Sequence, residues 1–193
     1  IELQPEDILR KDAAAAKIIY LEGYLFDAPA GPAIFARAAA LAAEFKCKIS
    51  LSLSDPWCAE RHRDALTNFV KNHVDILFSN EDEASSLCDA PVEEATRLLI
   101  DNVGEIIVTQ GPKGAFAGNS ANQIEVAARP LGKVIDTTGA GDLFAAGYLY
   151  GRTNGYSLKD SAMIASITAG EIISHVGARP QANLRTLVAE AVS

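Results

Sequence analysis

The chain has 193 residues, of which 49% are hydrophobic, 22% charged and 7% aromatic. This balance is typical of a globular protein and excludes a disordered chain, a collagen-like repeat and a small disulfide-stapled scaffold. The 17 lysines and arginines are outnumbered by 25 aspartates and glutamates, which gives a formal charge of −8 at pH 7. Such a surface argues against binding to nucleic acid or to an anionic membrane. A small phosphate ligand stays compatible with it, because backbone amides can bind phosphate.

The residues that bear on cellular location favour the cytoplasm. The chain begins with Ile1 rather than methionine, and the residues after it have neither the basic nor the apolar region of a signal peptide. No apolar run approaches the roughly 20 residues of a membrane span. The three cysteines, Cys47, Cys58 and Cys88, are widely spaced, so no pair of them has the spacing of a zinc or redox site. We therefore expect reduced, structural thiols.

Strand-like and helix-like segments alternate along the first half of the chain. The strand-like segments are short runs of β-branched and aromatic residues that end at turn residues. The helix-like segments are rich in alanine or amphipathic. The predicted strands are 18–22, 48–53 and 75–79, and the predicted helices are 7–17, 33–45 and 61–72, with a further helix opening at Asn80.

The same alternation continues in the second half. The run 105–109 is apolar in its centre, which is typical of a buried parallel strand. Repeated strand–helix–strand units predict an α/β protein with a mostly parallel sheet and right-handed crossovers. The other predicted elements are a hairpin over 115–127, a short strand over 134–136, and helices over 91–102, 139–151, 157–175 and 183–192.

Three polar clusters directly follow predicted strands. They are Asn80–Glu83, Thr109–Gly114 and Asp136–Asp142. In α/β sheets the ligand lies at the carboxyl ends of the strands. These clusters are therefore the candidates for the functional site.

The third cluster combines an anion hole with a carboxylate. Gly139, Ala140 and Gly141 open a predicted helix, where free N–H groups and the helix dipole attract a negative group. Asp142 lies in the first turn of that helix and could accept a proton from an alcohol. This pairing favours phosphoryl transfer to a hydroxyl. On spacing alone, the alternative that Asp142 only caps a helix stays open.

The segment Asp136–Gly147 resembles the C-terminal signature of the ribokinase, or PfkB, family of carbohydrate and nucleoside kinases. The resemblance covers essentially the whole chain, and Ser54–Pro56 and His175–Pro180 are most similar to the adenosine-kinase-like branch. Further matches are Asn80 and Glu83 with the family's Asn-x-x-Glu element, and Thr109, Gly111 and Gly114 with its nucleotide-binding loop.

The resemblance implies a three-layer ribokinase-like fold with a mostly parallel central sheet flanked by helices. Residues 1–193 correspond to the C-terminal part of such a kinase domain, because nothing here matches the family's N-terminal strands and lid. Without the lid, water exclusion and substrate closure would fail. We therefore expect little or no kinase activity from this piece alone. The family often pairs through its lid, which implies a homodimer of the intact protein.

The resemblance also implies ligands and roles for individual residues. Asp142 would be the general base, and Gly139, Ala140 and Gly141 would form the anion hole. The implied ligands are ATP, Mg²⁺ and a monovalent cation such as K⁺. The residues that would contact ATP are Asn80, Thr109, Gly111 and Gly114, with Ile172 and His175 near the adenine. Glu83 would hold Mg²⁺ through water. The monovalent cation would be held by Asp136, Thr138 and the carbonyl of Ala178.

The implied activity is transfer of the γ-phosphate of ATP to a hydroxyl of a small sugar or nucleoside. The acceptor class, adenosine-like or ribose- and fructose-like, stays open at this point. A different class of function is also compatible with the fold: a non-catalytic nucleotide-binding module or regulator. Asp142 favours the kinase, because a pure binder has no need of a base.

Overall fold

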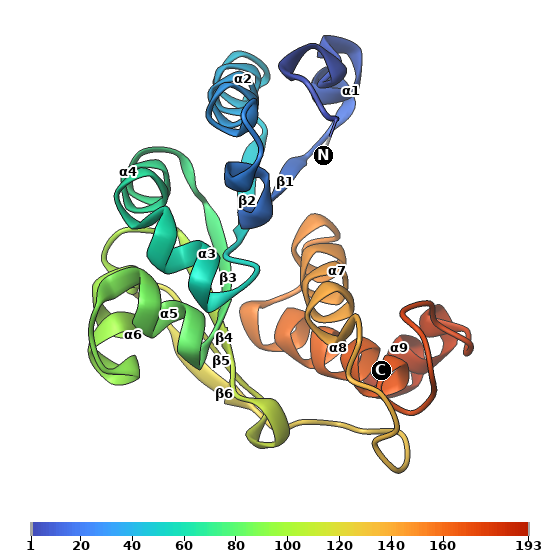
Figure 1. Cartoon of the computed structure of the whole chain (residues 1–193). Coiled ribbons are helices and arrows are strands. Elements are labelled where there is room, and N and C mark those ends of the chain that lie inside the picture. Colours follow the sequence, from blue (N-terminus) through green and yellow to red (C-terminus); the bar gives the residue numbers. More distant parts are fainter. Residues whose placement is uncertain (1, 193) are drawn as a thin grey trace. The chain divides into compact units, whose positions relative to one another are not determined.

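A computed structural model of the chain describes residues 2–192, which form two compact units (Figure 1). Unit 1 comprises the residues up to Val108 together with Asn119–Ala121. Unit 2 comprises Thr109–Gly118 and the residues from Asn122 onward.

Unit 1 is built on parallel strands whose order in the sheet follows their order in the chain. β1 pairs with β2 from Ile18–Lys48 to Glu22–Ser52, and β2 pairs with β3 in the same direction. This pairing confirms the predicted α/β class, since each parallel connection needs a crossover helix. The strands are β1 (Ile18–Glu22), β2 (Lys48–Ser52), β3 (Ile76–Asn80) and β4 (Glu105–Thr109).

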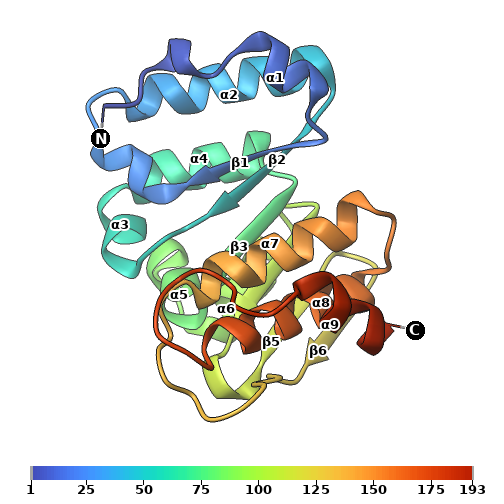
Figure 2. The same cartoon turned by 90° about the vertical axis from the view of Figure 1, so that its right-hand side faces the viewer.

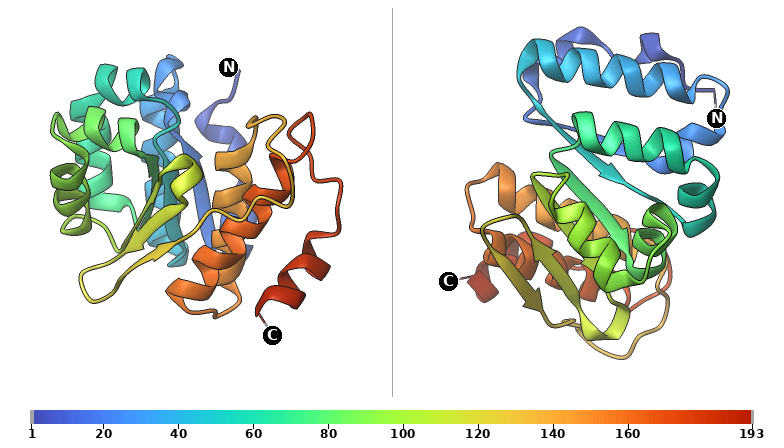
Figure 3. Two further views of the ribbon diagram at one scale, coloured as in Figure 1. Left: turned by 90° about the horizontal axis from the view of Figure 1, so that it is seen from below. Right: turned by 90° about the vertical axis from the view of Figure 1, so that its left-hand side faces the viewer.

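Helices cover one face of these strands (Figure 1 and the right panel of Figure 3). α2 contacts β1 and β2, and α5 contacts β3. Ile34 and Leu41 of α2, together with Leu51 and Leu77 of the strands, are fully buried and form the centre of the core. The helical elements are η1 (Pro5–Asp7), α1 (Arg10–Ala15), η2 (Gly23–Asp27), α2 (Gly31–Phe45), α3 (Pro56–Arg61), α4 (Arg63–His73), α5 (Glu81–Cys88) and α6 (Val92–Ile100).

The predicted helix over 61–72 is confirmed as α4, and a further helix, α3, precedes it. α3 begins at Pro56, where Asp55 accepts a hydrogen bond from the N–H of Cys58 at 2.8 Å and the proline fits the first turn. It ends where the His62 backbone leaves helical geometry. α3 was not among the predicted helices, because Asp55 and Pro56 are typical of a turn as well as of a helix start. The predicted helix over 7–17 is shorter, as η1 and α1.

In the described part of unit 2, a short 3₁₀ helix and a hairpin are followed by three α-helices. β5 and β6 pair in antiparallel fashion from Ala115–Val126 to Gly118–Gln123, and both contact α8. α7 packs along α8, with α9 beside α8 (Figure 2). The elements are η3 (Gly111–Lys113), β5 (Ala115–Gly118), β6 (Gln123–Val126), α7 (Ala140–Thr153), α8 (Leu158–Ile172) and α9 (Leu184–Val192). Among residues 2–192, no helix is both long and apolar enough to cross a membrane.

The predicted strand Val134–Asp136 is wrong. Residues 134–136 lie in no helix or strand, and the N–H of Ile135 donates to the carbonyl of Ile173 at 2.8 Å, just beyond α8. Val134 and Ile135 are half exposed. An apolar pattern predicts a strand only where a neighbouring strand can pair, and here the segment bonds to a helix end instead.

The α7–α8 contact generates a stability prediction. A methyl group at Gly147 would lie 2.3 Å from Thr168 Oγ1 and 2.8 Å from Ala165 Cα. Gly147→Ala should therefore lower the free energy of unfolding by about 1–3 kcal/mol through overpacking, measured by urea denaturation. Gly141→Ala is the matched control. Gly141 lies in the same helix as Gly147, but a methyl group at Gly141 would meet no other atom within 4 Å. Equal stability of the two variants would contradict the close contact.

Candidate functional site

A cavity of about 560 Å³ lies within unit 2. Two backbone turns that the sequence analysis singled out separately line it together. Thr109, Gly111 and Gly114 come from the end of β4 and the loop after it, and Ala140 and Gly141 from the start of α7. Ala169 and Ile173, from α8 and the turn after it, add apolar wall. The cavity thus combines amide-rich turns with an apolar surface.

The first turn depends on glycine geometry. Gly111 has φ 56° and Gly114 has φ 110°, which are conformations that residues with a side chain rarely adopt. At Gly114 a methyl group would also lie 1.9 Å from the carbonyl oxygen of Val126. The N–H of Gln110 donates to the Gly114 carbonyl at 2.8 Å and closes the turn. The backbone itself therefore forms this side of the cavity.

The second turn opens α7. Gly139, with φ 80°, is the N-cap, and the N–H of Ala140 donates to the carbonyl of Thr137 at 3.1 Å. A methyl group at Gly141 would meet nothing within 4 Å. Packing inside the protein therefore does not require a glycine at position 141. A ligand that approaches the helix N-terminus would require one, because a side chain there would occupy the space of the ligand. The positive end of the helix dipole makes this a suitable place for an anion.

Asp142 lies in the first turn of α7, directly after Gly141, and is exposed to solvent. The described hydrogen bonds do not tie its carboxylate to a cap position. The side chain is therefore placed next to the cavity lining and is accessible to a ligand.

Asp136 joins its own loop to the segment after α8. Its Oδ1 accepts hydrogen bonds from the N–H and hydroxyl of Thr138, at 2.9 and 2.7 Å, and its Oδ2 accepts one from the N–H of Gly177 at 3.1 Å. These bonds, first of all the one from the Thr138 hydroxyl, lower the pKa of Asp136 to about 2. Ala178 follows Gly177 and packs close to Gly139. The structure thus brings together Asp136, Thr138 and the segment with Ala178.

Glu171 is a residue that the sequence analysis missed. Its buried Oε1 accepts the N–H groups of Gln181 and Ala182, both at 2.8 Å, and lies 3.2 Å from His175 Nε2. Burial raises the pKa of Glu171, but these hydrogen bonds outweigh it and leave the pKa below its ordinary value. The carboxylate therefore anchors the segment after α8. The sequence did contain a pattern that could have pointed to Glu171: it is an acidic residue within the apolar predicted helix 157–175, four residues before His175.

The two residues predicted near the adenine have different positions. His175 contacts Glu171, and Ile172 is fully buried. Neither lines the cavity; the neighbouring Ile173 does.

In unit 1, Asn80 and Glu83 form a reciprocal cap at the start of α5. Asn80 Oδ1 accepts the N–H of Glu83 at 2.8 Å, and the Glu83 carboxylate accepts the N–H of Asn80 at 3.0 Å and its Nδ2 at 2.7 Å. A capping box of this kind satisfies donors that a helix start leaves free. It also fixes the orientation of the Glu83 carboxylate.

Glu83 belongs to an acidic group at the carboxyl ends of β1, β2 and β3. Burial raises its pKa to about 7, and the charges of Asp55 and Glu22 add to this, although the Asn80 N–H opposes it. Glu22 in turn accepts a hydrogen bond from the Ser54 hydroxyl at 2.8 Å. No motif in the sequence predicted a role for Glu22. Its position as the last residue of β1 was the available signal.

Comparison with known proteins identifies the family. The pfkB family carbohydrate kinase model matches residues 1–184. Adenosine kinase from Saccharomyces cerevisiae is 30% identical over 176 residues, which cover 84% of this chain and 51% of that protein. The chain thus spans about half the length of this curated relative.

Two solved structures are similar along nearly the whole chain. A probable sugar kinase from Rhizobium etli is 36% identical with a TM-score of 0.95, covering 99% of this chain and 58% of that one. Adenosine kinase from Sinorhizobium meliloti is 35% identical with a TM-score of 0.94, covering 98% and 59%. These likenesses confirm the ribokinase-like fold. The chain therefore belongs to the pfkB family of carbohydrate kinases.

Proposed function

We propose that this chain is the nucleotide-binding and catalytic part of an ATP-dependent kinase that phosphorylates a hydroxyl of a small sugar or nucleoside. The observation that supports it most strongly is the cavity of unit 2, which combines the turn at Gly111–Gly114 with the N-terminus of α7. Backbone amides stabilise phosphate charge without a side-chain cation, which suits a chain with a net charge of −8. The apolar wall with Ala169 and Ile173 suits a nucleobase.

Asp142 is the proposed general base. Its carboxylate accepts the proton of the acceptor hydroxyl while the hydroxyl oxygen bonds to the γ-phosphorus of ATP and the bond to the β,γ-bridging oxygen breaks. The electron pair of that bond leaves with ADP. The amides at Gly139–Gly141 stabilise charge on the transferring group, which is the main contribution that a protein makes to phosphoryl transfer.

Glu83 is the proposed Mg²⁺ residue, acting through water. The donors around it are oxygens, which Mg²⁺ prefers. The raised pKa of Glu83 reflects a buried carboxylate with other acidic groups near it, an environment in which a divalent cation would stabilise the ionised form. When bound, Mg²⁺ would neutralise phosphate charge. For a monovalent cation we propose Asp136, Thr138 and the carbonyl of Ala178, since the lowered pKa of Asp136 keeps its carboxylate ionised.

The acceptor class follows the relatives, which are named adenosine kinase and sugar kinase. Because the chain covers 58% of the sugar kinase structure, we infer that residues outside it complete the acceptor pocket. On this proposal the 193-residue chain binds ATP but transfers phosphate slowly by itself.

Gly141→Ala tests the anion hole. The methyl group would occupy open space where the phosphate is proposed to lie, so ATP affinity measured by calorimetry should fall at least about tenfold, the equivalent of a lost hydrogen bond. Gly132→Ala is the control, since it also places a methyl group in open space but lies outside the cavity lining. Unchanged affinity in Gly141→Ala would refute the proposed phosphate position.

Asp142→Asn tests the base. In the intact protein, turnover with adenosine, inosine, ribose or fructose should fall by about 10²–10⁴-fold, the usual contribution of a general base, while ATP still binds. Full turnover in the variant would refute the assignment. If the intact unsubstituted protein binds ATP but phosphorylates none of these acceptors, the non-catalytic nucleotide-binding module is the better description.

The raised pKa of Glu83 predicts a pH dependence of stability. Between the ordinary value of 4.5 and about 7, the folded state binds more protons than the unfolded state. The free energy of unfolding should therefore fall as pH rises through this window, by up to about 3 kcal/mol. Glu83→Gln should remove this dependence, and Mg²⁺ should reduce it in the unsubstituted chain. The exposed Asp82→Asn on the same helix is the control; an equal slope in Glu83→Gln would contradict the prediction.

A further inference from the structure

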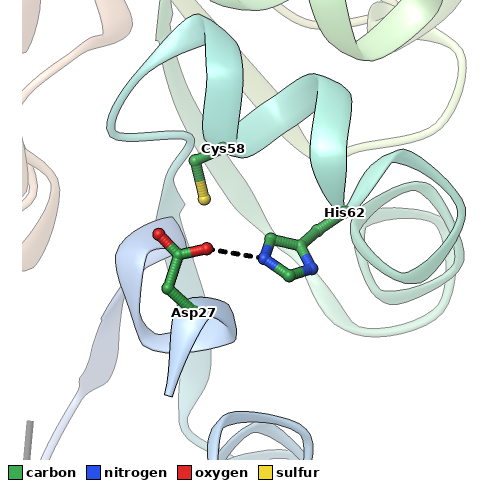
Figure 4. A group of neighbouring side chains, drawn as sticks. All are labelled: Asp27, Cys58 and His62. Carbon is green, nitrogen blue, oxygen red and sulfur yellow. Dashed lines mark hydrogen bonds and ion pairs between the residues drawn. The ribbon is translucent and has the colours of Figure 1, made fainter. Parts of the chain in front are cut away.

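Three side chains of unit 1 form a compact group that the proposed kinase chemistry does not use. They are Asp27, Cys58 and His62 (Figure 4). Their Oδ, Sγ and ring nitrogen atoms all lie within 4.8 Å of one another, and His62 Nε2 is 2.7 Å from Asp27 Oδ1. In Figure 4 the thiol and the imidazole both point toward the carboxylate.

From this geometry we infer that Asp27, Cys58 and His62 form a binding site for Zn²⁺. Thiolate, imidazole and carboxylate are the three side-chain donors that zinc uses in proteins. A hard cation such as Mg²⁺ has little affinity for sulfur or nitrogen donors. The set is therefore chemically distinct from the oxygen donors around Glu83, and the inference does not depend on the proposed kinase function.

The local fold places two of the donors on one helical turn. Cys58 lies within α3, and His62 follows four residues later as its C-cap, so both side chains emerge on the same side. Asp27 is the last residue of η2, and α3 contacts η2. A metal ion bound to all three would therefore cross-link η2 to the end of α3. The cysteine spacing could not reveal this, because a single cysteine is combined with donors of other types.

The dimensions fit after a small adjustment. With zinc–sulfur bonds near 2.3 Å and zinc–nitrogen and zinc–oxygen bonds near 2.0–2.1 Å, tetrahedral ligand atoms lie about 3.3–3.6 Å apart. The present separations, from 2.7 Å to at most 4.8 Å, bracket that range. Asp27 has 38% of its side chain exposed and can shift, whereas Cys58 is fully buried. Because Asp27 is exposed, solvent can supply a water molecule as the fourth ligand.

Neighbouring side chains contact two of the donors, His62 and Asp27. The Phe26 ring lies 5.6 Å from the His62 ring and packs on Phe35, so the imidazole rests against the core. Arg61 donates to both oxygens of Asp27, at 3.1 and 2.9 Å. Arg61 is more than half exposed and can release Oδ1 to the metal while keeping Oδ2.

Metal binding also requires loss of the thiol proton. Burial raises the pKa of Cys58 to about 11, and the charges of Asp27 and Asp55 add to this, so the free thiol is protonated at neutral pH. The balanced reaction, with His62 neutral, is the exchange of one proton for one Zn²⁺: the S–H bond breaks, a sulfur–zinc bond forms and the thiol proton passes to solvent. The proton that His62 Nε2 shares with Asp27 moves to Nδ1 through solvent, which frees the Nε2 lone pair for the metal.

Cobalt substitution tests the site directly in the whole chain. One equivalent of Co²⁺ should produce a thiolate-to-cobalt charge-transfer band, and Zn²⁺ should displace it. Cys58→Ser should abolish the band. His62→Gln and Asp27→Asn should weaken Co²⁺ binding by more than about 100-fold, since even outer-shell partners change metal affinity by about 10–100-fold.

Cys47→Ser and Cys88→Ser are the matched controls, because both positions are free cysteines outside the group. Both variants should keep the band and the zinc affinity. A second readout is the unfolding temperature, which Zn²⁺ should raise in the unsubstituted chain and in these controls but not in Asp27→Asn, where an exposed carboxylate is replaced by an amide of nearly the same size. A chain that gives no charge-transfer band, or a band that survives Cys58→Ser, overturns the inference.

Discussion

The proposed phosphate site depends on backbone turns that only glycine adopts without strain. At Gly114 a side chain would meet the carbonyl of Val126, and at Gly139 it would meet Ala178. Both residues have positive φ. The loop after β4 and the start of α7 line the same cavity. The backbone amides of both turns can therefore bind one ligand without any basic side chain. The net charge of −8 is then no obstacle to phosphate binding, since oriented peptide dipoles do not appear in a count of charged residues.

Two buried or semi-buried carboxylates keep the segment after α8 in position beside those turns. Asp136 binds the N–H of Gly177, and Glu171 binds the N–H groups of Gln181 and Ala182. In each case several donors converge on an acid whose pKa they lower, so the anchors stay ionised near neutral pH. The position of Ala178 against Gly139 is thus a consequence of hydrogen bonds made several residues away.

The sequence predicted local features well and long-range partners poorly. The glycine turns, the Asn80 cap and the hairpin follow from short patterns, and each appears where expected. The strand predicted at 134–136 failed because the partner of Ile135 is a carbonyl beyond α8, nearly forty residues ahead. Glu171 and the group of Asp27, Cys58 and His62 were missed for the same physical reason: their partners come from separate elements, and only folding brings those together.

The two acidic environments of unit 1 call for different cations. Around Glu83, oxygen donors and a pKa of about 7 describe a carboxylate that a hard divalent ion would ionise. Around Cys58, a buried thiol with a pKa of about 11 would give up its proton only to an ion that forms strong bonds to sulfur. The two groups therefore prefer different cations, because one offers hard oxygen donors and the other a soft sulfur donor. This holds even though the charge of Asp55 raises the pKa of both Glu83 and Cys58. Mg²⁺ at the first group would serve phosphate chemistry, whereas Zn²⁺ at the second would cross-link η2 to α3 and act on stability alone.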